Sequence, residues 1–104
     1  RLVSRVFAGY GAADLQDFAA RITASAGAVC LVAAVDESAN RSSFLFAAAP
    51  DVLAAMNDLL KRSLAPAGGK GGGNAATAQG GAPTTDADGI LAAARTMLIN
   101  EFSP

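Results

Sequence analysis

The first third of the chain alternates between short apolar runs and one amphipathic segment. Residues 2–7 are rich in branched and aromatic side chains and stop at residues 9–11, Gly-Tyr-Gly, which predicts a first strand. Four apolar positions then recur at the helical spacing i, i+3, i+4, i+7: Leu15, Phe18, Ala19 and Ile22. Asp14 is placed to cap this helix and Gly27 to end it.

The next segments predict two antiparallel strands. Residues 28–35 are continuously apolar without helical spacing, which is typical of a central strand covered on both faces. The polar interval 36–42 is interpreted as a loop, and residues 43–47 as the returning strand of a hairpin. Because a strand-helix-strand unit is normally parallel and right-handed, the complete sheet is expected to be mixed.

Two further helices are predicted in the second half of the chain. Pro50 fits the first turn of one, and its expected inner face carries Val52, Met56, Leu59, Leu60 and Ser63. Thr85 and Asp88 resemble a capping box for the other. Its apolar stripe consists of Ile90, Leu91, Ala94 and Leu98.

The segment between these helices, residues 65–83, carries seven of the 11 glycines, so no regular helix can cross it. A short strand around residues 77–79 is compatible with it. The expected architecture is one α/β domain over residues 1–104, a mixed β-sheet packed with about three helices and a glycine-rich loop between the last two helices. Since the chain opens on Arg1 and enters a strand at once, it is expected to be a fragment of a longer protein.

Composition argues against catalysis. The chain has no histidine, which removes the commonest general base and metal ligand. Four aspartates lie at predicted helix starts, where a negative charge is stabilised by the helix dipole, so we expect them to cap helices: Asp14, Asp17, Asp86 and Asp88. Cys30 lies in an apolar strand and is expected to be an inert core thiol. We therefore expect no catalytic residue, no metal and no cofactor in this domain, and a cytoplasmic location with no membrane partner.

One constellation could bind a ligand. Residues 68–74 read Gly68, Gly69, Lys70, Gly71, Gly72, Gly73 and Asn74, and Gln79, Gly80 and Gly81 follow shortly after. Glycines reach positive φ, so successive N–H groups can form a concavity for phosphate, to which Lys70 would add charge. Lys61 and Arg62 precede this segment and are expected to assist. Tyr10, between two glycines, is expected either to stack on a base or to cover the core edge.

The alternatives for this segment are less favoured. A P-loop needs serine or threonine after its lysine, and Lys70 is followed by Gly71. A dinucleotide-binding fingerprint would follow a strand, whereas this segment follows a helix. A flexible linker is the remaining structural interpretation. With a net charge of −1, any nucleic-acid contact must come from a local patch.

The run from Gly68 to Gly73, four residues, and then Ala78-Gln79-Gly80-Gly81 resembles the C-terminal, DHH-associated domain of alanyl-tRNA synthetases and of long alanyl-tRNA-editing (AlaX-like) proteins. The resemblance implies a domain that binds tRNA, tRNA-Ala foremost, or single-stranded nucleic acid, next to an upstream catalytic or editing domain of the same chain. It also implies a role in joining aminoacylation to hydrolysis of tRNA mischarged with serine or glycine.

Two departures keep alternatives open. In the related DHH phosphoesterases a Gly-Gly-Gly-His segment holds substrate phosphate, and here Asn74 stands at the histidine position, which disfavours that class. Many synthetases resemble Gly-Gly-Gly-Arg-Pro-Asp-Met-Ala-Gln-Gly-Gly, and this chain lacks the arginine, which favours an editing-type relative. The substrate-binding domain of a DHH phosphoesterase and a homodimerisation domain remain the alternatives.

Overall fold

The computed structural model describes the chain except for residues 1, 9–11, 53–54 and 103–104. It contains one five-stranded sheet in the order β1-β2-β3-β5-β4. The strands are β1 (Leu2–Ala8), β2 (Val29–Asp36), β3 (Arg41–Ala48), β4 (Lys70–Gly73) and β5 (Thr77–Ala82). The β1 and β2 strands are parallel and all other neighbours are antiparallel, which confirms the predicted mixed sheet.

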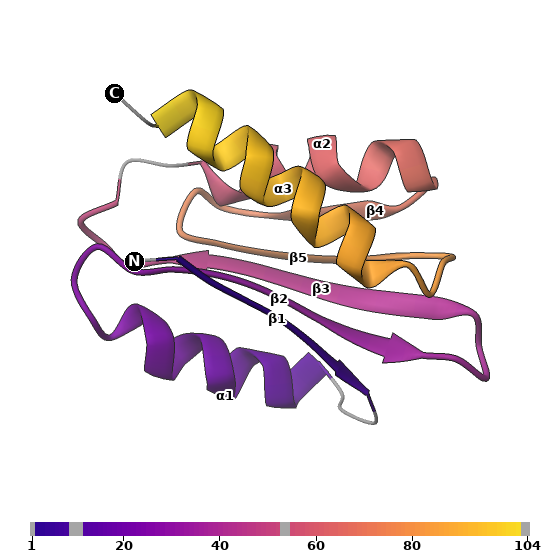
Figure 1. The fold of residues 1–104 in the computed structure, drawn as a ribbon. Helices are drawn as coiled ribbons and strands as arrows, with labels where there is room; N and C mark the ends of the chain where they lie inside the picture. Colours follow the sequence, from indigo (N-terminus) through magenta and orange to yellow (C-terminus); the bar gives the residue numbers. More distant parts are fainter. Residues whose placement is uncertain (1, 9–11, 53–54, 103–104) are drawn as a thin grey trace.

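Helices cover both faces of the sheet and make three layers (Figure 1). Helix α1 (Ala12–Thr23) packs on β2 and β3 from one side. On the other side, α2 (Met56–Leu64) lies over β4 and β5, and α3 (Ala87–Phe102) lies over β1 and β2. A 3-10 turn, Ala65–Ala67, follows α2 directly. None of the described helices is long and apolar enough to cross a membrane.

The central strands are buried on both faces, as their continuous apolar runs predict. Because side chains alternate along a strand, Leu31 and Phe46 pack toward α2 and α3, whereas Val32 and Leu45 pack toward α1. Leu31 and Phe46 are 0% exposed, and Leu59 of α2 is 2% exposed. The expected core between the sheet and the helices is confirmed at these three positions.

Helix α2 begins at Met56, so the predicted start at Pro50 is wrong. Pro50 and Asp51 form a turn instead, in which the Val52 N–H donates to the Ala49 carbonyl at 3.0 Å. The Asp51 carboxylate accepts the Gly27 N–H at 2.9 Å. This bond ties the turn to the loop between α1 and β2, which delays the start of the helix.

The cap of α3 also differs from the predicted capping box. Asp86, not Thr85, precedes the helix, and its carboxylate accepts the Gly89 N–H at 3.2 Å. The Thr84 hydroxyl oxygen accepts the Asp86 N–H at 3.1 Å and orients this cap. The Asp86 carboxylate, one residue nearer the helix than Thr85, therefore caps its first turn.

Candidate nucleic-acid interface

The glycine-rich segment is a β-hairpin and not a loop. Strand β4 pairs with β5 in the register Lys70↔Gly81, Gly71↔Gly80, Gly72↔Gln79 and Gly73↔Ala78. Across this fully described segment, positive φ occurs only at Gly68 (74°) and Gly73 (149°). Residues 70–73 form a strand, in which successive N–H groups point to opposite edges, and the N–H groups of Gly68 and Gly69 donate to the carbonyl oxygens of Ala65 and Leu64 at 3.1 and 2.9 Å. The predicted concavity of N–H groups is therefore not formed. The short strand expected near residues 77–79 is confirmed and runs further, to Ala82.

Close packing explains two of the glycines. An ideal Cβ on Gly80 would lie 2.4 Å from the Lys70 carbonyl oxygen, and one on Gly71 would lie 2.7 Å from a methyl carbon of Leu60. Both positions are on the side of the hairpin that α2 covers. Glycine here lets α2 approach the hairpin backbone, which is a packing requirement and not a ligand requirement.

Asn74 closes the hairpin turn. Its Oδ1 accepts the N–H groups of Ala76 and Thr77, each at 2.9 Å, while its own N–H donates to the Thr77 carbonyl oxygen at 2.9 Å. This geometry gives Asn74 a structural role in the turn. Asn74 was expected to contact nucleic acid, and its side-chain oxygen is engaged within the protein instead.

The strand alternation turns Lys70 and Gly72 to the face opposite α2. Their partners on β5, Gly81 and Gln79, share this face. Gln79 contacts the α1 side directly, because Gln16 Nε2 of α1 donates to its Oε1 at 3.2 Å. Helix α1 covers β2 and β3, so the described helices leave this side of β4 and β5 uncovered. We call the uncovered area, formed by Lys70, Gly72, Thr77, Gln79, Gly81, Arg41 and Ser43, the open face.

Arg41 is a site residue that the sequence did not predict. It is the first residue of β3, and its guanidinium lies over Gly81, where an ideal Cβ would be 3.2 Å from Nη2 and 3.6 Å from Nε. Arg41 and Lys70 therefore flank the same glycine from the two neighbouring strands. The polar interval 36–42 was interpreted as a loop, which concealed the strand position of Arg41.

The two cations of the open face are not neutralised. Neither Arg41 nor Lys70 forms an ion pair with any residue that the structure describes. Asp36 is the cross-strand partner of Arg41 in the β2–β3 register, but its carboxylate accepts the Ser38 hydroxyl at 2.7 Å and the Ala39 N–H at 3.3 Å. The hydrogen bond from Ser38, and then that from Ala39, hold the pKa of Asp36 below its ordinary value of 3.8.

A groove of about 180 Å³ runs beside the open face, between α1 and the β3–β5 pair. Its lining residues are Leu15, Ser43, Phe44, Leu45, Gln79 and Gly80. The hydrogen bond between Gln16 and Gln79 spans from α1 to β5. Sequence patterns did not indicate Gln16 or Ser43, because only the packing of α1 on the sheet brings them near Gln79.

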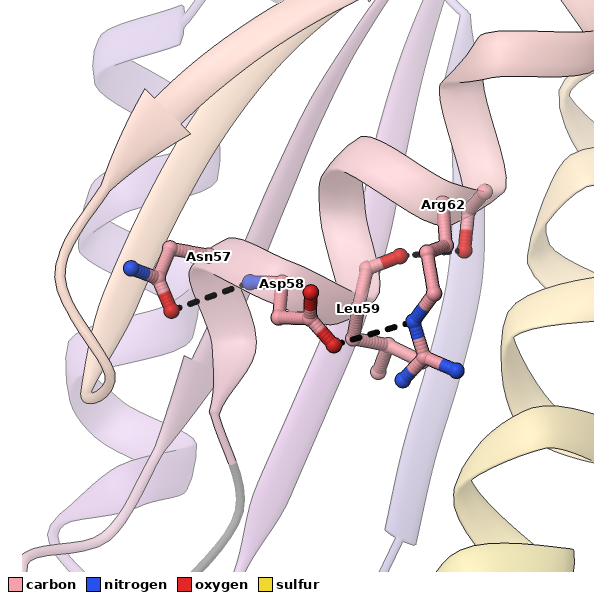
Figure 2. A network of polar contacts seen from close by, with 5 residues as sticks. Asn57, Asp58, Leu59 and Arg62 are labelled. Carbon is pink, nitrogen blue, oxygen red and sulfur yellow. Dashed lines mark hydrogen bonds and ion pairs between the residues drawn. The ribbon is translucent and has the colours of Figure 1, made fainter.

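Lys61 and Arg62 are not part of this surface. Both belong to α2, which covers the opposite side of the sheet. The Arg62 guanidinium is partly neutralised, since its Nε lies 3.0 Å from Asp58 Oδ2, and Figure 2 shows this ion pair on α2 with the strands behind it. The structure thus brings Lys70, Gly72, Gln79 and Gly81 together and separates them from Lys61 and Arg62.

The one cysteine of the chain lies in the core. Cys30 is fully buried, and desolvation raises the pKa of its thiol to about 11, as expected for a core cysteine. Groups of three or more histidine, cysteine, aspartate or glutamate side chains in metal-binding proximity do not occur among the described residues. Tyr10 lies outside the described residues.

Known proteins were compared with the chain at the levels of sequence and structure. The sequence matches no protein-family model and no curated protein. The structure is similar to the crystal structure of the C-Ala domain from Aquifex aeolicus alanyl-tRNA synthetase, with a TM-score of 0.82 and 20% sequence identity, covering 99% of this chain and 91% of that chain. At this identity the similarity concerns the fold: the chain has the fold of the C-Ala domain of an alanyl-tRNA synthetase.

Proposed function

We propose that this chain is a non-catalytic, tRNA-binding domain and that the open face contacts the RNA. The observation that carries the proposal is the placement of two cations, Arg41 and Lys70, on the strands that flank β5 at Gly81, neither of them ion-paired with a residue that the structure describes. The shared fold with the C-Ala domain of an alanyl-tRNA synthetase supports tRNA as the nucleic acid.

The geometry of the open face suits a phosphate backbone. Lys70 lies directly across from Gly81 in the β4–β5 register, and Arg41 reaches Gly81 from β3. Since neighbouring strands are about 4.8 Å apart, two strand spacings of roughly 10 Å separate the backbones that carry the two cations. Gly72 has no side chain, and a Cβ there would meet nothing within 4 Å, so a phosphate and its sugar can approach β4 closely at this residue.

Binding through this face should depend on salt to a limited extent. Two phosphate contacts release about two counterions, which gives a slope of roughly −1.4 to −1.8 in log K against log salt. The chain as a whole carries a net charge of −1, so no general positive field adds to these contacts. The proposed domain is therefore a weak binder that assists a larger protein.

We expect the domain to work in the cytoplasm, beside an upstream domain of a synthetase or an editing protein in the same chain. Neither the phosphoesterase alternative nor the homodimer alternative gains support from the site. Asn74, at the position of the phosphoesterase histidine, closes the β4–β5 turn. A phosphoesterase role would also require metal-dependent hydrolysis that co-purifies with this domain and is lost when one of its carboxylates is replaced.

The test is a fluorescence titration with tRNA at several salt concentrations. Lys70→Ala and Arg41→Ala should each flatten the salt slope by roughly 0.7 to 0.9, because each removes one phosphate contact. Lys61→Ala is the matched control, since it removes the same charge from the other side of the sheet, and it should change the slope little. Equal binding by wild type and both open-face variants would overturn the proposal, and sedimentation would then test dimerisation.

A further inference from the structure

The groove beside the open face is positioned to take part of the same ligand. On β3 and β5, Ser43 pairs with Gly81 and Leu45 pairs with Gln79. These two pairs are two residues apart along antiparallel strands, about 7 Å. The groove therefore begins about 7 Å from a ligand group that Arg41 and Lys70 hold at Gly81.

The groove combines an apolar floor with a polar rim. Leu15 and Leu45 contribute its floor and are each 2% exposed. Ser43 and the exposed Gln79 add polar groups to its lining. A flat ring with polar edges fits such a lining, whereas a phosphate would find no cation among the six lining residues.

The amide pair at the rim offers both kinds of hydrogen-bonding group. Gln16 Nε2 donates to Gln79 Oε1 at 3.2 Å. This bond leaves the Gln16 carbonyl oxygen as an acceptor and the Gln79 amide nitrogen as a donor. Adjacent donors and acceptors occur on the edges of all nucleobases, so the pair can bind a base edge without selecting one base.

We infer that this groove is a subsite for one unpaired nucleobase, whose edge is bound by Gln16 and Gln79 while its phosphate lies on Arg41 and Lys70. The inference rests on the proposed function and adds where one unpaired base of the RNA would be held and which residues would hold it. A base-paired helix does not fit, because its bases are stacked inside and an RNA major groove is too deep and narrow for side chains.

The test compares two ligands that carry the same number of phosphates. One is a short single-stranded oligonucleotide, and the other is a stable abasic oligomer of equal length. Wild type should prefer the oligonucleotide. Gln79→Ala should lower the affinity for the oligonucleotide about five- to tenfold and leave the affinity for the abasic oligomer unchanged. Thr96→Ala is the control, because Thr96 is exposed on α3, on the other side of the sheet, and lies neither in the groove nor on the open face.

Lys70→Ala separates this inference from the proposed function. This variant should lower the affinity for both ligands to the same extent, because it removes a phosphate contact. Equal binding of the two ligands by wild type, or an equal loss for both in Gln79→Ala, would overturn the base subsite and leave the proposed function standing. If Lys70→Ala and Arg41→Ala change neither affinity, both proposals fall. Urea melts of each variant confirm that the protein is folded in every comparison.

Discussion

The guanidinium of Arg41 lies beside Gly81, with its Nη2 3.2 Å from the position that a Cβ on residue 81 would occupy. The two residues are far apart in the sequence but lie on the neighbouring strands β3 and β5. Glycine at this position therefore sets where the charge of Arg41 is presented. The carboxylate across the strand, Asp36, is engaged in its own turn and does not hold Arg41 away from the open face.

Gly81→Ala should weaken tRNA binding by displacing Arg41. The new Cβ would lie 3.2 Å from Arg41 Nη2, and also 3.2 Å from the Ser42 carbonyl oxygen, so the guanidinium must move. Because both changes act on one contact, Gly81→Ala and Arg41→Ala should be non-additive in binding, with a coupling of about 0.5 to 3 kcal/mol. A double-mutant cycle of titrations measures this coupling, and additive losses would mean that the two residues act separately.

Gly72→Ala and Gly80→Ala should have opposite consequences. A Cβ on Gly72 meets nothing within 4 Å, so the variant should keep its stability within about 0.5 kcal/mol and weaken tRNA binding by crowding the open face. A Cβ on Gly80 would lie 2.4 Å from the Lys70 carbonyl oxygen, which should cost about 1 to 3 kcal/mol or more.

Urea unfolding of these two variants checks the stability part, and the tRNA titration checks the binding part. A stable Gly72→Ala variant with unchanged affinity would show that the RNA does not approach β4 at this residue. A fully stable Gly80→Ala variant would mean that the hairpin and α2 are less tightly packed than the described contacts.

The strands and the core could be predicted because their signals are local. The apolar runs at 2–7, 28–35 and 43–47 indicate strands directly, and the buried positions of Leu31 and Phe46 follow from the last two runs. The glycine segment could not be predicted in the same way. Glycine suits a loop and equally suits a strand pressed against a helix, and only the contact of Leu60 with Gly71 distinguishes the two.

The residues of the open face were predicted in part. Lys70, Gly72, Gln79 and Gly81 were identified because they are close in sequence. Arg41, Ser43 and Gln16 could not be, since their proximity depends on the pairing of β3 with β5 and on the packing of α1. Lys61 and Arg62 were grouped with Lys70 for the converse reason: sequence proximity conceals the sheet that lies between them.

Leu59→Ala should cost about 2 to 5 kcal/mol of unfolding free energy, because Leu59 is 2% exposed between α2 and the sheet. Ile99→Ala is the control, since Ile99 lies on α3 and is 47% exposed, and its loss should be within about 0.5 kcal/mol. Urea melts measure both. A loss below about 1 kcal/mol for Leu59→Ala would contradict its core position.

Stability should fall at alkaline pH because of Cys30. Burial raises the pKa of its thiol to about 11, whereas the unfolded chain has a thiol near the ordinary 9.0. Between these values the unfolded state loses the proton and the folded state keeps it, so stability decreases as pH rises. Cys30→Ala should lack this decrease, although it also leaves a small cavity. Parallel pH-dependent slopes for wild type and Cys30→Ala would contradict the raised pKa.

The packing of α2 on the hairpin also has an evolutionary consequence. Gly71 and Gly80 are required because Leu60 and the Lys70 carbonyl leave no room for a side chain, whatever the domain binds. Relatives that have lost nucleic-acid binding should therefore retain these glycines, while positions 41, 70, 72 and 79 drift. A glycine-rich pattern of this spacing therefore indicates how the hairpin packs against α2. Binding must be inferred from the residues that point to the opposite side of the hairpin.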